Sequence, residues 1–258
     1  MQRWARALLA AAFGLVPLDA WSQTRPGGAA SGPPPPPRLR IVLNGTASLE
    51  KLTFDGSRSF TEFAEEGRLD ADYTSRTAAG AEVGIQFNVT RWLGIGAAFN
   101  LSRRDGRASY TAALPHPLYF NQPRSKTGEV DRLRYEEKVF HWDLIFSSGA
   151  GPLGVYLFGG ASFFRVDAEL LGRLQYTHVY PYDSAQVTVT EVPAATASDN
   201  PIGYNAGAGL DYRFGAHVGF GAQARFSRAR VSLAPAPDAT VELDAGGFQV
   251  AVGARFYF

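Results

Sequence analysis

The fold is decided by the alternating stretch Gly246-Gly-Phe-Gln-Val-Ala-Val-Gly-Ala-Arg-Phe-Tyr-Phe258. Successive side chains of a β-strand point to opposite faces, so residues two apart share a face. One face is apolar and carries Phe248, Val250, Val252, Ala254, Phe256 and Phe258. The other carries Gln249, Ala251, Gly253, Arg255 and Tyr257. A β-barrel in lipid turns apolar residues outward and polar residues inward, so this stretch predicts a membrane-spanning strand.

Upstream segments repeat this period of two and bring the number of predicted strands to eight. The predicted strands are Arg40 to Thr53, Ala79 to Thr90, Trp92 to Arg104, Lys138 to Ser148, Gly154 to Ala168, Ile202 to Phe214, His217 to Val231 and Gly246 to Phe258. Each can cross the membrane when tilted, which takes about 9 to 11 residues. The fifth is ambiguous because Val155 to Phe158 is apolar on both faces. There, Arg165 and Asp167 are taken to face inward, and Tyr156, Phe158, Phe164 and Val166 are therefore expected to face outward.

The connections after the second, fourth and sixth segments are short, whereas those after the first, third, fifth and seventh are long and polar. Outer-membrane barrels have short periplasmic turns and long outer loops. We therefore predict an all-β protein, an eight-stranded antiparallel up-and-down transmembrane β-barrel. An even number of strands returns the chain to its starting side, so both termini are expected in the periplasm of a Gram-negative-type bacterium.

The N-terminal residues are typical of an exported protein. Arg3 and Arg6 precede the short apolar run Ala7 to Leu18, and small residues at Ala20 and Ser22 fit cleavage after Ser22. We therefore expect a signal peptide over residues 1–22, a Pro-rich periplasmic leader over 23–38 and the barrel over 39–258. The prolines favour an extended spacer over a docking motif for the leader.

Two stretches indicate a family. Gly203-Tyr-Asn-Ala-Gly-Ala-Gly-Leu-Asp-Tyr-Arg-Phe214 and Val218-Gly-Phe-Gly-Ala-Gln-Ala-Arg-Phe226 resemble strands of the OmpA-like and opacity-type outer-membrane barrels. The ending Ala254-Arg-Phe-Tyr-Phe258 resembles the C-terminal assembly signal of such barrels, with Phe256 and Phe258 as its aromatic residues. The resemblance implies outer-membrane lipids and the barrel-assembly machinery as partners. The peptidoglycan-binding domain of OmpA-type proteins is not expected here.

The sequence offers no convincing catalytic or cofactor site. Its net charge of +1 gives no reason to expect a nucleic-acid partner, and it contains no Cys. No His pair has metal-ligand spacing, and a loop calcium site at Asp70 and Asp72 is disfavoured. His141 lies near Asp143 but has no Ser two residues on, so a structural role is favoured over a general base. We expect no enzyme activity, no metal and no cofactor.

The alternation places opposite charges inside the barrel. This predicted lumen charge network consists of Glu50, Glu82, Arg104, His141, Asp143, Arg165, Asp167, Asp211, Arg225 and Arg255. Buried charges must pair, because an unpaired one is very costly. A structural salt-bridge plug is favoured over a gate for ions, and Arg225 is expected near the centre of either arrangement.

The long connections Gly106 to Glu137 and Leu170 to Pro201 are rich in Tyr, Pro, Ser and Thr. They are equally consistent with unselected loops and with surfaces that bind a protein or glycan. We therefore expect a structural or surface-interaction, adhesin-like role. A low-conductance channel for ions or small solutes is the alternative, and an enzyme acting on envelope lipids is less favoured.

Overall fold

The computed structural model describes residues 38–148, 151–183, 187–236 and 239–258. The predicted signal peptide lies outside the described residues, as does the predicted leader apart from Arg38. No helix in the described ranges is long and apolar enough to cross a membrane. The strands are β1 Leu39–Ser48, β2 Thr53–Glu62, β3 Glu65–Ser75, β4 Ala79–Asn88, β5 Leu93–Leu114, β6 Arg124–Ser147, β7 Leu153–Leu171, β8 Gln175–His178, β9 Val187–Glu191, β10 Ala194–Asp199, β11 Ile202–Arg213, β12 Val218–Ala236 and β13 Ala239–Tyr257.

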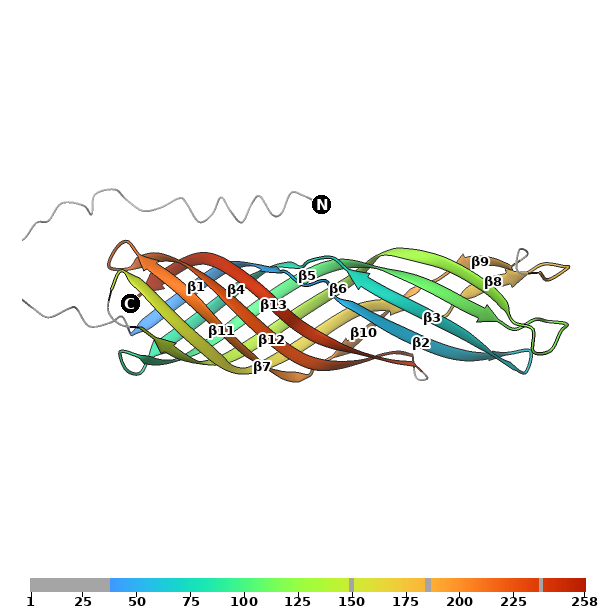
Figure 1. The fold of residues 1–258 in the computed structure, drawn as a ribbon, viewed down its shortest axis with the longest axis horizontal. Helices are drawn as coiled ribbons and strands as arrows, with labels where there is room; N and C mark the ends of the chain where they lie inside the picture. The colour runs from blue at the N-terminus through green and yellow to red at the C-terminus, as the bar shows by residue number, and fades with distance from the viewer. Residues whose placement is uncertain (1–37, 149–150, 184–186, 237–238) are drawn as a thin grey trace, which may run out of the picture. The chain divides into compact units, whose positions relative to one another are not determined.

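Eight strands pair antiparallel into a closed ring, in the order β1, β4, β5, β6, β7, β11, β12 and β13 (Figure 1). The ring closes where β1 meets β13, with Ile41 opposite Phe256 and Asn44 opposite Gly253. Closure satisfies the backbone groups that an open sheet edge would expose to lipid. The predicted eight-stranded antiparallel barrel is confirmed.

Several strands extend far beyond their predicted ends. The expected loops over 106–137 and 232–245 are largely strand, because β5, β6, β12 and β13 continue with the same period of two. The hairpin of β2 and β3 joins this extension at β5, and β10 joins it at β7. We call the extension, with the separate β8–β9 hairpin, the stalk.

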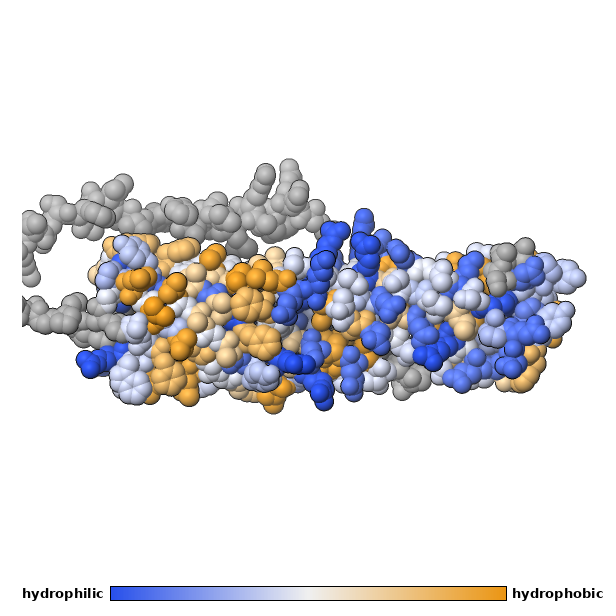
Figure 2. All heavy atoms as spheres, viewed as in Figure 1, coloured by the Kyte–Doolittle hydropathy of each residue, from blue (hydrophilic) through white to orange (hydrophobic). Residues whose placement is uncertain are grey.

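The polarity of the two faces inverts between the barrel and the stalk. The barrel turns exposed apolar side chains outward, and we call this set the apolar belt: Leu43, Val83, Ile85, Phe87, Ile95, Phe99, Leu101, Phe140, Trp142, Leu144, Phe146, Leu157, Phe163, Tyr204, Leu210, Phe220, Phe226, Phe248 and Val252. In the stalk the inward residues are apolar, as with Leu114, Val166 and Leu233, all of which are 0% exposed. On the face shown in Figure 2, apolar residues gather over the barrel and hydrophilic residues over the stalk.

The structure corrects the predicted face of β7. Tyr156, Phe158, Phe164 and Val166 were expected to face outward, but all four are buried inside. Phe164 and Val166 belong to the part of β7 in the stalk, where apolar side chains form the interior. Tyr156 and Phe158 belong to the barrel part, where their rings contact Arg40 and Arg225 in the lumen.

A glycine pair marks the transition on β13. Gly246 and Gly247 have φ angles of 98° and 99°, a conformation that glycine adopts without the steric cost of a side chain. The residues of β13 that precede this pair, 239–245, do not pair with β1, which ends at Ser48. They pair with β12 alone and belong to the stalk.

Candidate functional site

Three arginines of the lumen pair with three carboxylates. Asp211 lies between Arg40 and Arg255: Arg255 Nε donates to Asp211 Oδ1 at 2.9 Å, and Arg40 binds the other carboxylate oxygen. Arg255 is 0% exposed, and its Nη1 also donates to Asn44 Oδ1 at 2.6 Å. The guanidinium of Arg40 lies 4.7 Å from the centre of the Tyr156 ring. Burial of these charges is thus offset by pairing and ring contacts.

Arg225 lies between the other two carboxylates of the network, Glu82 and Asp143. Its Nη2 lies 3.4 Å from Glu82 Oε2 and 3.4 Å from Asp143 Oδ2, and its guanidinium lies 4.9 Å from the centre of the Phe158 ring. Glu82 Oε1 accepts hydrogen bonds from Asn44 Nδ2 at 2.8 Å and Gln223 Nε2 at 2.7 Å. Because Asn44 also contacts Arg255, the two groups of charges form one network. Three positive and three negative side chains balance within it.

A third buried pair lies where the barrel meets the stalk. Arg104 Nη2 is 3.6 Å from Glu137 Oε1, which also accepts a hydrogen bond from the Tyr135 hydroxyl at 2.9 Å. Arg104 was predicted to lie in the lumen, but Glu137 was assigned to a loop. Continuing the period of two from His141 back through Val139 would have placed Glu137 on the inward face.

His141 has a partner that sequence reasoning missed. Its Nδ1 lies 2.8 Å from Ser162 Oγ, which accepts a hydrogen bond from Asn205 Nδ2 at 3.0 Å. Ser162 faces His141 across the pairing of β6 with β7, and only the register of these strands brings the two together. A His beside a Ser is the pairing of general base and nucleophile. Here both side chains are at most 1% exposed, so a lipid or glycan outside the barrel does not reach them.

Three predicted members of the network lie outside the lumen, and their assignment was wrong. Arg165 and Asp167 face outward on the stalk, where Arg165 Nε lies 3.5 Å from Asp167 Oδ2. Their position follows from the inversion of polarity along β7. Glu50 is exposed because β1 ends two residues earlier, at Ser48.

Side chains nearly fill the described lumen. The cavity beside Glu82, Asp143 and Arg225 has a volume of about 10 Å³, close to the least that a water molecule requires. At the end near Phe258, a cavity of about 50 Å³ is lined by Arg40 and Tyr156 among others. Within the described ranges, no group of three His, Cys, Asp or Glu side chains is placed to hold a metal ion.

The far end of the stalk exposes aromatic side chains. We call this end the aromatic tip, and its exposed rings include Phe63 at 48%, Tyr119 at 57%, Phe120 at 80% and Tyr180 at 77%. They come from the β2–β3, β5–β6 and β8–β9 connections. Phe63 lies 5.4 Å from His178 and Tyr180 lies 5.8 Å from Tyr182, measured between ring centres.

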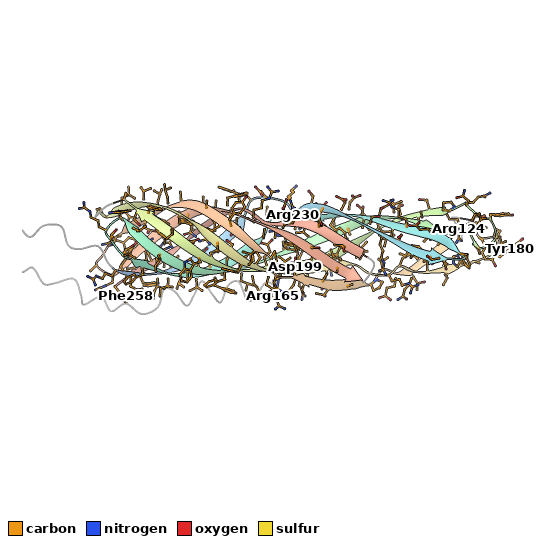
Figure 3. The ribbon with its side chains drawn as sticks, turned by 90° about the horizontal axis from the view of Figure 1, so that it is seen from below. Arg124, Arg165, Tyr180, Asp199, Arg230 and Phe258 are labelled. Carbon is orange, nitrogen blue, oxygen red and sulfur yellow. The ribbon has the colours of Figure 1, made fainter. Side chains whose placement is uncertain are left out.

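Arg124 links the β5–β6 connection to the end of β8 and the β8–β9 connection. It is 4% exposed, and its Nη2 donates to Pro115 O at 2.6 Å and lies 2.8 Å from His178 Nδ1. Its Nη1 donates to Tyr182 O at 3.3 Å. Burial lowers the pKa of Arg124 from its usual value, and the charge of Glu62 opposes this. Figure 3 shows Arg124 and Tyr180 at the end opposite Phe258.

Comparison with known proteins agrees with this architecture. A model of the family described as "Outer membrane protein beta-barrel domain" matches residues 38–256. No curated protein matches the chain. Among solved structures, the chain is similar to the outer membrane protein OprG from Pseudomonas aeruginosa, with 9% identity, a TM-score of 0.50, and coverage of 87% of this chain and 97% of that one.

Two other solved structures have similar coverage. Ail, the attachment invasion locus protein of Yersinia pestis, is 11% identical with a TM-score of 0.39, and 86% of this chain and 99% of Ail are covered. Neisserial surface protein A is 11% identical with a TM-score of 0.36, and 85% of this chain and 97% of that one are covered. At such low identity, likeness to solved structures concerns the fold alone.

Proposed function

Because this chain belongs to the outer membrane protein β-barrel domain family, we propose that it is a surface-interaction protein with an adhesin-like role. In this proposal the barrel anchors the protein in the outer membrane of a diderm bacterium. The lumen charge network closes the barrel, and the stalk carries the aromatic tip away from the cell to a protein or glycan partner.

The main support for this proposal is the inversion of polarity between the barrel and the stalk. A stalk with an apolar interior and a charged exterior suits water on its outside, whereas the apolar belt suits lipid. The short turns lie at the opposite end from the stalk, and outer-membrane barrels keep short turns in the periplasm. Both observations favour a stalk outside the cell and termini in the periplasm.

The exposed aromatic side chains of the tip support a role in binding a partner. Phe120 is 80% exposed and Tyr180 is 77% exposed. Contiguous exposed apolar groups mark interaction sites. Aromatic rings dominate the binding energy of protein interfaces. Arg124 holds the connections in place, so less conformational freedom is lost on binding.

A low-conductance channel is the alternative, and the polar lining of the lumen favours it. The small volume of the cavity beside Arg225 opposes it, because ions need a connected hydrated path. We propose that the lumen network serves as a structural plug.

The proposal is tested by displaying the protein on a bacterium that lacks adhesins and counting the cells that attach to cultured epithelial cells. The variant Phe63→Ser/Phe120→Ser/Tyr180→Ser removes three exposed rings of the tip, one from each of its connections. A hot-spot side chain contributes about 2 kcal/mol or more, so each lost anchor weakens affinity about thirtyfold. We expect attachment to fall to that of cells without the protein.

The matched control is Ser109→Ala/Thr111→Ala/Thr127→Ala, which changes three exposed polar residues on the outer face of the stalk. This control should attach like the wild type. Wild-type cells that attach no better than the tip variant, at equal surface amounts, would overturn the proposal.

A further inference from the structure

A small cavity lies at the mouth of the barrel, at the end that has the short turns and that Phe258 marks in Figure 3. We call it the turn-end cavity. It has a volume of about 50 Å³, and its lining includes residues of β1, β7, β11 and β13 and of the β4–β5 connection. Since a buried water molecule requires about 10 to 15 Å³, the cavity has room for about three or four of them. The four oxygen atoms of a tetrahedral oxyanion need a similar space.

Positive charge exceeds negative charge around the turn-end cavity. Three arginines line it, Arg40, Arg91 and Arg213, and Asp211 is the one carboxylate in the lining. Both oxygens of Asp211 are already engaged, because Arg40 binds one and Arg255 Nε donates to the other at 2.9 Å. Neither Arg91 nor Arg213 has a carboxylate partner within the ranges that the structure describes. Two guanidinium charges at the cavity are therefore not neutralised by acidic side chains of these ranges.

Arg213 is supported at the cavity by an aromatic ring. Its guanidinium lies 4.5 Å from the centre of the Tyr257 ring, which is 3% exposed. The Nε atoms of Arg213 and Arg40 are buried and have no hydrogen-bond partner in the described part of the chain. A buried donor without a partner is costly, so an anion that accepts hydrogen bonds from these atoms is favoured.

The wall formed by β7 leaves space for such an anion. Gly154 and Tyr156 lie on the inward face of β7 and line the cavity. A Cβ atom at Gly154 would meet no other atom within 4 Å. Ser147, the last residue of β6, adds a hydroxyl group to the lining. The lining thus combines open space with several hydrogen-bond donors.

We propose that the turn-end cavity binds a phosphate group. Arginine binds phosphate oxygens through paired, charge-assisted hydrogen bonds, and Arg91 and Arg213 supply these groups. A phosphate group carries about two negative charges near neutral pH, which balances the two guanidinium charges. The phosphate is either the free ion or an ester at the end of a larger molecule. This inference goes beyond the surface-interaction role and does not rest on it, because the cavity and the aromatic tip lie at opposite ends.

The test is calorimetric titration of the refolded protein, in a maltoside detergent at low ionic strength, with inorganic phosphate. Sodium chloride supplies a monovalent anion that lacks the four oxygens. We expect phosphate to bind about tenfold or more tightly than chloride, because two guanidinium groups bind its oxygens together. Glycerol 3-phosphate distinguishes the sources. Binding as tight as that of inorganic phosphate indicates an ester, and binding of inorganic phosphate alone indicates the free ion.

Two variants test the cavity in different ways. Arg213→Gln should weaken phosphate binding about tenfold, the usual effect of losing a charged hydrogen bond, and it breaks no ion pair of the described residues. Gly154→Val keeps the net charge but fills the space, and valine is well tolerated in strands. Gly154→Val should also weaken binding about tenfold, which a diffuse attraction between charges does not predict.

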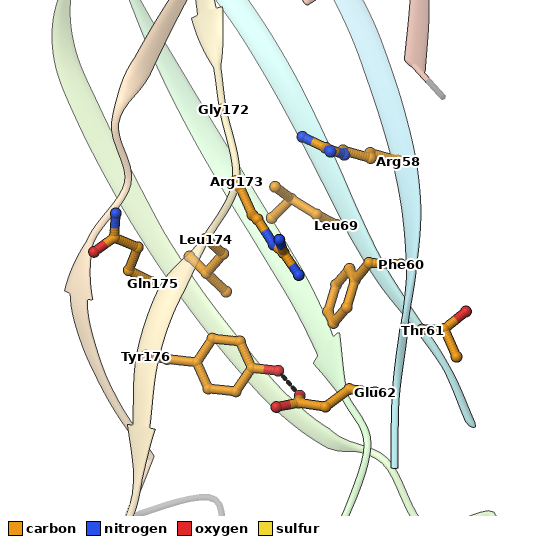
Figure 4. Close-up of a pocket in the computed structure, with 10 residues that line it drawn as sticks. All are labelled: Arg58, Phe60, Thr61, Glu62, Leu69, Gly172, Arg173, Leu174, Gln175 and Tyr176. Carbon is orange, nitrogen blue, oxygen red and sulfur yellow. Dashed lines mark hydrogen bonds between the residues drawn. The ribbon is translucent and has the colours of Figure 1, made fainter. Parts of the chain in front are cut away.

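A larger cavity in the stalk supplies the matched control. It has a volume of about 320 Å³ and lies between β2 and residues 172–176 (Figure 4). Arg173 lines it and is exposed, and Glu62 there accepts a hydrogen bond from the Tyr176 hydroxyl. Arg173→Gln makes the same change in net charge as Arg213→Gln, but beside a different cavity. It should leave phosphate binding unchanged.

Three results would overturn the turn-end site. They are the absence of phosphate binding at millimolar concentration, chloride binding as tight as that of phosphate, and an Arg173→Gln protein that loses as much affinity as Arg213→Gln. Phosphate binding by Gly154→Val equal to that of the wild type would equally place the anion elsewhere. None of these results bears on attachment through the aromatic tip, because Phe63, Phe120 and Tyr180 do not line the turn-end cavity.

Discussion

Replacing Arg225 with Met should destabilise the barrel by about 3 to 5 kcal/mol, the usual cost of removing one partner from a buried ion pair. Arg225 is 5% exposed and its guanidinium lies within ion-pair distance of both Glu82 and Asp143, so its loss leaves these two buried carboxylates without their nearest cation. Met has a similar length and keeps the apolar contact with Phe158. The expected loss therefore comes from charge and not from an empty space.

The assay is urea unfolding of the refolded protein in lipid vesicles, followed by the fluorescence of Trp92 and Trp142. Arg228→Met is the matched control, because Arg228 pairs with Asp244 at 2.5 Å but both side chains are about half exposed. Water and salt screen such surface pairs, so they add little to stability. Arg225→Met should therefore destabilise the protein strongly and Arg228→Met scarcely, although both residues lie on β12.

A compensating variant tests the cause. Asp143→Asn/Arg225→Met removes one negative and one positive charge, so two of each remain in the network, and Glu82 still accepts the hydrogen bonds of Asn44 and Gln223. Its stability should return to within about 2 kcal/mol of the wild type, because neutral replacement of a buried ion group is often tolerated. An Arg225→Met protein within about 1 kcal/mol of the wild type would refute the role of this network.

Three further outcomes are expected. Phe258→Ser should reduce the amount of protein inserted in the outer membrane of cells while leaving refolding in detergent unchanged, because Phe258 is 62% exposed and is proposed to act as an assembly signal. The hydrogen bond from Ser198, at 2.6 Å, and then the hydrogen bond from Lys138 lower the pKa of Asp167, and partial burial opposes them. The Asp167 carboxylate therefore stabilises the fold above its usual pKa of about 3.9. Asp167→Asn should destabilise the protein at pH 7, by an amount that vanishes as the pH falls through the lowered pKa. Planar bilayers containing the refolded protein should show no reproducible ion steps, and steady steps would favour the channel.

The sequence predicted the barrel because lipid imposes one rule on every spanning strand. In β11 and in the barrel parts of β12 (218–227) and β13 (248–257), each outward position is apolar or small and most inward positions are polar or glycine, so the faces can be assigned without a structure. The pairs formed by Asp211 with Arg255 and by Asp143 with Arg225 join residues whose inward position was predicted. Their pairing depends on strand neighbours and register, which alternation does not supply.

The stalk could not be predicted by the same rule. Arg165 and Asp167 were placed inside because polar residues face inward in lipid, but in the stalk the apolar side chains face inward and the charged ones outward, as in a protein surrounded by water. Along β5 the outward face changes from Phe99 and Leu101 to Arg103, Asp105 and Arg107, and this switch within one strand is the signal that could have marked the start of the stalk. The contact of His141 with Ser162 required the register of β6 and β7.

The most direct test of the account is the side of the membrane on which the stalk lies. The protein contains no Cys, so Tyr180→Cys and Ala216→Cys each introduce a single thiol, at the aromatic tip and at the turn between β11 and β12. Intact cells are treated with a polyethylene glycol maleimide too large to cross the outer membrane. We predict that Tyr180→Cys reacts in intact cells and that Ala216→Cys reacts only after the outer membrane is opened; reaction of Ala216→Cys alone in intact cells would contradict the account.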